Sequence, residues 1–271
     1  MAEATKKIVK RILFWIIAGP AILVVFVCCC ADRMIFHPPR SSYTQRSDIL
    51  TIPVTPKEKI AAMYRPAVPD SFVLLFSHGN AEDIGQNEDF FELANQHGFG
   101  VFAYDYRGYG LSDGRPGEKN TYQDIETAYN YLVEMLQIPP QRIIILGRSV
   151  GSGPSVWLAT QKPAAGLILE SPFASAFRVI TKYNILPFDP YDNLSRIKNV
   201  RCPVLIIQGR EDEVVGFWHG PVLYEAANEP KMNFWVENAG HNDLLWVAGE
   251  EYWKTLKRFK EMLSTGETTG K

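Results

Sequence analysis

Six short aliphatic runs follow one another along the chain after residue 70, and a segment with helical spacing separates most neighbouring pairs. The runs lie at 71–77, 100–108, 142–147, 165–171, 202–209 and 232–238. Strands that are apolar along their whole length are typical of a parallel sheet buried on both faces. Helices are expected at 83–97, 121–136, 150–160, 218–227 and 250–263. This alternation predicts an α/β fold with a mostly parallel, doubly wound sheet.

The rest of the composition is that of one large globular domain. The chain has 271 residues, of which 46% are hydrophobic and 21% charged. Segments at 48–54 and 59–65 have the composition of an opening pair of strands. A net charge of −2 gives no basis for binding nucleic acid. Three of the four cysteines are adjacent, at 28–30, so the sequence offers no disulfide framework.

An apolar segment at 12–31 stands apart from the rest of the sequence. Its 20 residues carry no charge, and a helix of that length is about 30 Å long, the thickness of a bilayer core. Lys6, Lys7, Lys10 and Arg11 precede it, and basic residues favour the cytoplasmic side of a membrane helix. We therefore expect a single-pass membrane protein with a cytoplasmic N-terminus and its folded domain on the opposite side.

Two alternatives to this anchor remain open at the level of sequence. Small residues end the segment, as in a cleaved signal peptide, and Pro20 interrupts it near its middle, as in a helix that bends within one leaflet. With the anchor preferred, the chain divides into a basic segment at 1–11, a transmembrane segment at 12–31, one α/β domain at 32–263 and a flexible tail at 264–271.

A serine stands between the aliphatic run at 142–147 and the helix that follows it. The residues are Gly147-Arg148-Ser149-Val150-Gly151, which match the G-x-S-x-G pattern of a nucleophile elbow. The flanking glycines permit a tight turn that lifts the serine hydroxyl above the sheet. The backbone N–H of Val150, at the start of the helix, is then placed to stabilise an oxyanion. The pattern predicts that Ser149 is a nucleophile.

A serine hydroxyl needs a base to take its proton, and that base needs an acid to orient it. His241 follows the last aliphatic run and should emerge at the same edge of the sheet as Ser149. Asp212, flanked by two glutamates, follows the preceding run and is the preferred acid, with Glu170 as the alternative. The order Ser149, Asp212, His241 is one of the known chain orders of such a triad.

The loop after the first aliphatic run should supply the second oxyanion donor. It begins His78-Gly79-Asn80-Ala81. Because Gly79 lets the backbone approach the site, the N–H of Asn80 is the preferred donor and that of Ala81 the alternative. We expect His78 to brace the loop by hydrogen bonding rather than to act as the base.

The long connection at 171–200 is expected to form a short lid. It is rich in aromatic and aliphatic residues, a composition that suits an apolar acyl pocket. We expect Phe173, Phe177 and Tyr183 to contact the substrate.

Five motifs occur in order along the chain: SHGNAEDIG, DYRGYGLSDG, GRSVGSGPS, GREDEVV and AGHND. Together they resemble the membrane-associated α/β-hydrolase-domain serine hydrolases, the branch that includes protein depalmitoylases, over residues 72–263. The resemblance implies an α/β-hydrolase fold and a Ser149–Asp212–His241 triad that hydrolyses esters or thioesters without a metal or cofactor. Small acyl esters, lipids or lipidated proteins at a membrane are the implied substrates. A peptidase of the same fold and a catalytically silent, membrane-anchored interaction protein are the alternatives.

Overall fold

The computed structural model describes residues 2–66, 68–183 and 188–266. Its centre is an eight-stranded sheet with the order β1-β2-β4-β3-β5-β6-β7-β8. The strands are β1 (Ile49–Pro53), β2 (Lys59–Arg65), β3 (Val73–Ser77), β4 (Gly100–Tyr104), β5 (Ile143–Arg148), β6 (Gly166–Glu170), β7 (Val204–Gly209) and β8 (Lys231–Val236). β1 pairs antiparallel with β2, and β2 pairs antiparallel with β4. The six strands β4, β3, β5, β6, β7 and β8 are parallel to one another. The prediction of a mostly parallel sheet is confirmed.

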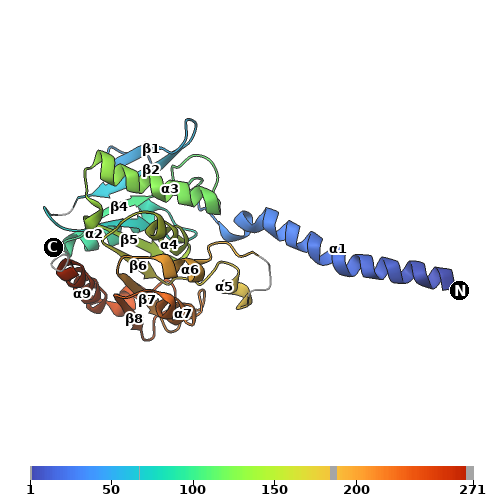
Figure 1. Cartoon of the computed structure of the whole chain (residues 1–271). Coiled ribbons are helices and arrows are strands. Elements are labelled where there is room, and N and C mark those ends of the chain that lie inside the picture. Colours follow the sequence, from blue (N-terminus) through green and yellow to red (C-terminus); the bar gives the residue numbers. More distant parts are fainter. Residues whose placement is uncertain (1, 67, 184–187, 267–271) are drawn as a thin grey trace.

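Helices cover both faces of this sheet (Figure 1). α2 (Glu88–Gln96), α8 (Leu244–Ala248) and α9 (Glu250–Gly266) pack on one face, and α3 (Glu118–Asn130), α4 (Ser152–Gln161) and α7 (His219–Ala226) on the other. Successive strand residues alternate between the two cores, because side chains in a strand point to opposite faces. Leu74 thus packs beside α2 and α9, while Leu75 faces α3 and α4.

Several short helical elements lie next to the longer helices or within the predicted lid. They are the 3-10 turns η1 (Ile84–Asn87), η3 (Pro140–Arg142), η4 (Ser149–Gly151) and η5 (Ile197–Asn199), the π turn η2 (Tyr131–Met135), and the helices α5 (Arg178–Thr181) and α6 (Asn193–Arg196). The helix expected at 83–97 is therefore η1 followed by α2. Residues 184–187 of the predicted lid and 267–271 of the predicted tail lie outside the described residues.

The N-terminal segment forms one helix, α1 (Ala2–Ile35), which extends away from the domain on the side of α5 (Figure 1). It continues through Pro20 and ends four residues later than the segment predicted at 12–31. Within 2–66, 68–183 and 188–266, no helix is long and apolar enough to cross a bilayer. The prediction of a transmembrane helix is therefore not supported.

The last turn of α1 belongs to the folded domain. Ala31 and Phe36 are buried, and the Phe36 ring packs edge-on against Tyr109 and Tyr191. The carboxylate of Asp32 accepts a hydrogen bond of 3.1 Å from the backbone N–H of Glu118, where negative charge stabilises the first turn of α3. The predicted domain boundary at residue 32 thus falls inside α1.

Candidate active site

Ser149 lies at the junction of β5 and η4 with a φ of 51°, in the left-handed region that residues with a Cβ rarely occupy. The glycines on either side allow this turn to sit against the sheet. A Cβ at Gly147 would lie 2.5 Å from the carbonyl oxygen of Gly151, and one at Gly151 would lie 2.2 Å from that of Ser77. Neither position has room for a side chain, so the elbow requires both glycines.

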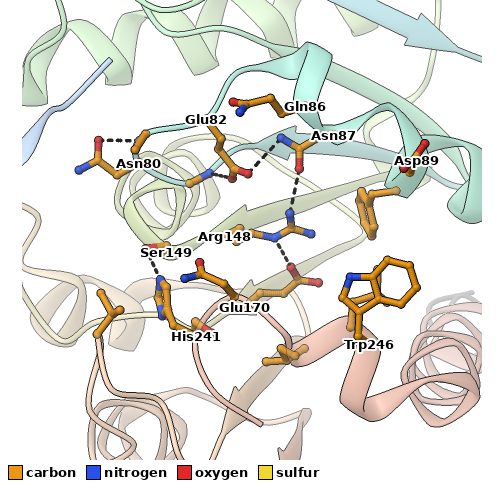
Figure 2. A pocket seen from close by; sticks show the side chains of 18 of the residues that line it. Asn80, Glu82, Gln86, Asn87, Asp89, Arg148, Ser149, Glu170, His241 and Trp246 are labelled. Carbon is orange, nitrogen blue, oxygen red and sulfur yellow. Dashed lines mark hydrogen bonds and ion pairs between the residues drawn. The ribbon is translucent and has the colours of Figure 1, made fainter. Parts of the chain in front are cut away.

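Three side chains from the carboxyl ends of different strands meet at this turn. The Nε2 atom of His241 lies 3.0 Å from the Oγ of Ser149 (Figure 2). Its Nδ1 lies 2.9 Å from Oδ2 of Asp212 and 3.0 Å from Oδ1. The structure therefore brings together the three residues that the sequence selected after β5, β7 and β8.

The carboxylate of Asp212 is fixed by more than the imidazole. Its Oδ1 accepts hydrogen bonds from the backbone N–H groups of Val214, at 3.1 Å, and Val215, at 2.7 Å. Its side chain is fully buried. A buried carboxylate held in this way keeps a proton on Nδ1 of His241 and leaves Nε2 free to accept one from serine.

The other candidate acid has a different partner. Oε2 of Glu170 accepts a 2.9 Å hydrogen bond from Nε of Arg148, and Oε1 accepts one from the hydroxyl of Tyr252. Arg148 also donates to Oδ1 of Asn87, at 2.9 Å (Figure 2). Its guanidinium lies 5.0 Å from the centre of the Phe90 ring. Glu170 therefore neutralises the guanidinium of Arg148 beside Ser149, and among the described residues its hydrogen-bond partners are Arg148 and Tyr252 rather than His241.

The loop after β3 lies directly against Ser149. A Cβ built on Gly79 would be 3.7 Å from Cβ of Ser149, so the loop backbone at Gly79 lies beside the serine. The carboxylate of Glu82 accepts from the N–H of Gly79, so the loop folds back on itself (Figure 2). The predicted oxyanion donors, Asn80 and Val150, directly follow Gly79 and Ser149 in the chain, and their role stays a prediction.

His78 is buried beneath this loop. Its Nδ1–H donates to the carbonyl of Gly79, at 2.7 Å, and its Nε2 lies 3.4 Å from Oδ1 of Asp105. Its own carbonyl accepts a 2.6 Å hydrogen bond from the hydroxyl of Tyr106. Burial raises the pKa of the Asp105 carboxyl to about 6. These contacts place His78 as a brace of the loop.

A cavity of about 590 Å³ opens beside Ser149 and His241 (Figure 2). One part of its wall is polar and includes Glu82, Gln86, Asn87, Arg148 and Asn242. Another part is apolar and includes Phe90 and Leu93 from α2, Leu244, Leu245 and Trp246 from α8, and Val214. Trp246 is 80% exposed at this wall. The cavity can therefore hold an apolar group and a polar group at once.

None of the three predicted substrate contacts lines this cavity. Phe173 is buried in the core against Tyr191. Phe177 and Tyr183 line a separate apolar pocket of about 210 Å³, which they share with Val27 of α1 and other residues. The lid packs toward α1, whereas the wall beside Ser149 comes from α2 and α8. The apolar residues of the predicted 83–97 helix and the Leu-Leu-Trp sequence just after His241 were the signals that could have identified that wall.

The eight-stranded sheet with a strained serine after β5 and an Asp–His pair after β7 and β8 defines the class of the protein: it has the α/β-hydrolase fold. A family model described as serine aminopeptidase, S33, matches residues 69–186. The α/β-hydrolase domain-containing protein 17B of Homo sapiens is 44% identical over 211 residues, which cover 76% of this chain and 71% of the relative. The corresponding protein 17C of Mus musculus is 40% identical over 210 residues, covering 76% and 64%. The chain belongs to the α/β-hydrolase family that contains these proteins, as its five motifs predicted.

Solved structures share the fold at low sequence identity. An esterase of Pyrococcus furiosus superposes with a TM-score of 0.71 at 18% identity, over 85% of this chain and 98% of that one. Est1E of Butyrivibrio proteoclasticus, solved with ferulic acid, superposes with a TM-score of 0.64 at 16% identity, over 77% and 98%. Membership of the family, together with this shared fold, supports hydrolase activity for the chain.

Proposed function

We propose that this chain is a serine hydrolase that cleaves acyl esters or acyl thioesters through a covalent acyl-enzyme. One observation carries the proposal: the continuous line of hydrogen-bond contacts from Ser149 through His241 to Asp212, at 3.0 and 2.9 Å. A hydroxyl aligned with an imidazole whose other nitrogen faces a buried carboxylate is the geometry that activates a serine.

The reaction follows from these positions. Nε2 of His241 takes the proton of Ser149 as Oγ attacks the substrate carbonyl, and the N–H groups of Asn80 and Val150 stabilise the oxyanion that forms. The tetrahedral intermediate then collapses, and His241 returns the proton to the departing alcohol or thiol. Water attacks the resulting serine ester by the same route, with His241 again as base, and releases the carboxylic acid. Asp212 keeps its negative charge throughout and stabilises the protonated imidazole.

The acyl group is proposed to lie along Phe90, Leu93, Leu245 and Trp246, because these side chains form the apolar wall of the cavity. The polar wall then faces the leaving group and the attacking water. Long acyl chains, including those of lipids and lipidated proteins, are the substrates that this division favours. The sequence predicts that the lid residues contact the substrate, whereas this proposal gives that role to α2 and α8.

Association with a membrane is part of the same proposal. α1 exposes large apolar side chains at Phe14, Trp15, Ile16 and Ile22, and basic residues precede them at 6–11. A helix of this kind favours an anionic lipid surface. Flotation of the purified protein with anionic vesicles tests this point, and protein that stays at the bottom of the gradient would contradict it.

A panel of acyl esters, acyl thioesters and aminoacyl amides tests the activity. We expect turnover of esters and thioesters, together with labelling by a fluorophosphonate. Peptidase activity is the second candidate, favoured by the aminopeptidase description of the matching family model, and preferential cleavage of amides would support it instead.

The variant Ser149→Ala identifies the nucleophile. It should abolish labelling and lower kcat by about 10⁶-fold if the triad acts as a unit. Ser155→Ala is the matched control, because the Ser155 hydroxyl is buried in α4, the helix that follows the elbow, and has no hydrogen-bond partner among the described residues. This control should label and turn over substrate as the wild type does. Full labelling of the Ser149→Ala variant would refute the proposal.

A further inference from the structure

The side chain of Asn80 joins the loop beside the nucleophile to the end of α1. Its Nδ2 donates a hydrogen bond of 2.6 Å to the carbonyl of Ile35, the last residue of the helix. Its Oδ1 accepts one of 2.9 Å from the backbone N–H of His37. Both ends of one amide are thus occupied by backbone groups that lie far away in the sequence.

Two further donors converge on the same oxygen. The hydroxyl of Tyr109 donates to Oδ1 of Asn80 at 2.7 Å, and the backbone N–H of Ala81 does so at 3.1 Å. Ala81 has a φ of 57°, in the left-handed region that a residue with a Cβ adopts only when its surroundings hold it there. The hydrogen bonds of the Asn80 side chain provide that restraint on the loop.

The end of α1 is itself held by the domain. Phe36 is buried, and its ring centre lies 6.5 Å from that of Tyr109 and 6.2 Å from that of Tyr191. Asp32 accepts from the backbone N–H at the start of α3. The position of the helix end is therefore determined by packing against α3 and the lid, and Asn80 connects that position to the loop.

We propose that the end of α1, residues 35–37, is a structural part of the oxyanion hole, and that the Asn80 side chain is the positioning group that connects the two. The inference rests on the proposed function, in which the backbone N–H of Asn80 stabilises the oxyanion. An oxyanion donor contributes only when it is already at the right distance from the developing charge. A loop released from α1 still binds substrate but stabilises the transition state less.

Two variants test the connection from the loop side. Asn80→Ala removes every hydrogen bond of the amide. Tyr109→Phe removes one donor to Asn80 and an acceptor for the backbone N–H of His37, at 3.2 Å, while it keeps the ring against Phe36. We expect kcat to fall about 10- to 100-fold for Asn80→Ala and about threefold or more for Tyr109→Phe, with KM within about twofold of the wild-type value. Tyr129→Phe is the matched control, because it removes one comparable hydrogen bond, to the carbonyl of Pro163, and should leave kcat unchanged.

A double-mutant cycle tests the connection from the helix side. Phe36→Leu loosens the packing of the helix end and should lower kcat in the wild-type background. If Phe36 acts on the active site through the hydrogen bonds of Asn80, then Phe36→Leu should lower kcat less in the Asn80→Ala background. Equal effects in both backgrounds would overturn the inference, as would variants with wild-type kcat. Fluorophosphonate labelling of the wild-type protein separates these results from failure of the proposed function, in which the unmodified enzyme itself neither labels nor turns over substrate.

Discussion

Glu170 neutralises the guanidinium of Arg148, the residue before Ser149, through a hydrogen bond of 2.9 Å. The pair is largely enclosed, with the glutamate 4% and the arginine 25% exposed, and it connects the ends of β5 and β6 where both residues line the cavity. Glu170 thereby compensates the positive charge that Arg148 places beside Ser149.

Removal of the Glu170 charge should therefore affect stability more than chemistry. We expect Glu170→Gln to lower the free energy of unfolding by about 2 kcal/mol, because the hydrogen bond to a charged group is weakened and Arg148 keeps its charge. Urea titration measures the change. Fluorophosphonate labelling should persist, and a loss of labelling in a folded variant would mean that Glu170 takes part in the triad.

Asp212→Asn should show the opposite pattern. Loss of the charge that supports protonated His241 should lower kcat by about 10⁴-fold, while the isosteric amide keeps the fold. Steady-state kinetics on a short ester measures the loss. Glu211→Gln is the matched control from the same loop and should retain most of the activity, so an equal loss there would show that the acid is misassigned.

The buried Asp105 predicts a dependence of stability on pH. Burial raises the pKa of its carboxyl from 3.8 to about 6 in the folded protein, so the folded state holds this proton more tightly than the unfolded state does. The stabilising contribution is complete below pH 3.8 and is lost as the pH rises through 6. Between about pH 4.5 and pH 7 the loss amounts to about 2 kcal/mol.

The variant Asp105→Asn isolates this contribution. We compare the free energies of unfolding of the wild type and the variant in urea. The difference between them, wild type minus variant, should be about 2 kcal/mol smaller at about pH 7 than at about pH 4.5. The exposed Asp89 supplies the control, since Asp89→Asn should give no such difference. A wild-type advantage that grows with pH would contradict the expected sign.

The rim residue Trp246 should govern the length of the acyl chain that the enzyme accepts. Trp246→Ala removes apolar area from the cavity wall but little from the core, because the side chain is 80% exposed. We expect kcat/KM for long-chain esters to fall about tenfold and that for acetyl esters to change little. Tyr183→Ala, in the separate pocket between the lid and α1, is the control, and a larger effect there would return the acyl site to the lid.

Local patterns in the sequence were sufficient for the sheet, for the helices on its two faces and for the elbow at Ser149. Apolar runs and helical spacing depend on neighbours within a few residues, and the glycines at 147 and 151 are required by contacts within the turn and with the adjacent strand. The chain order of Ser149, Asp212 and His241 could also be recognised, because parallel strands bring their carboxyl ends to one edge.

The partners of individual side chains could be decided only by the tertiary structure. Glu170 ends one aliphatic strand and Asp212 follows another, yet Glu170 meets Arg148 and Asp212 meets His241. Packing between β5, β6 and β7 determines which of these groups come within hydrogen-bond distance. The aromatic side chain of Phe173 would suit an apolar substrate pocket, but it is buried against Tyr191. The contact between Asn80 and the end of α1 joins segments 45 residues apart, and no local pattern encodes a distance of that kind.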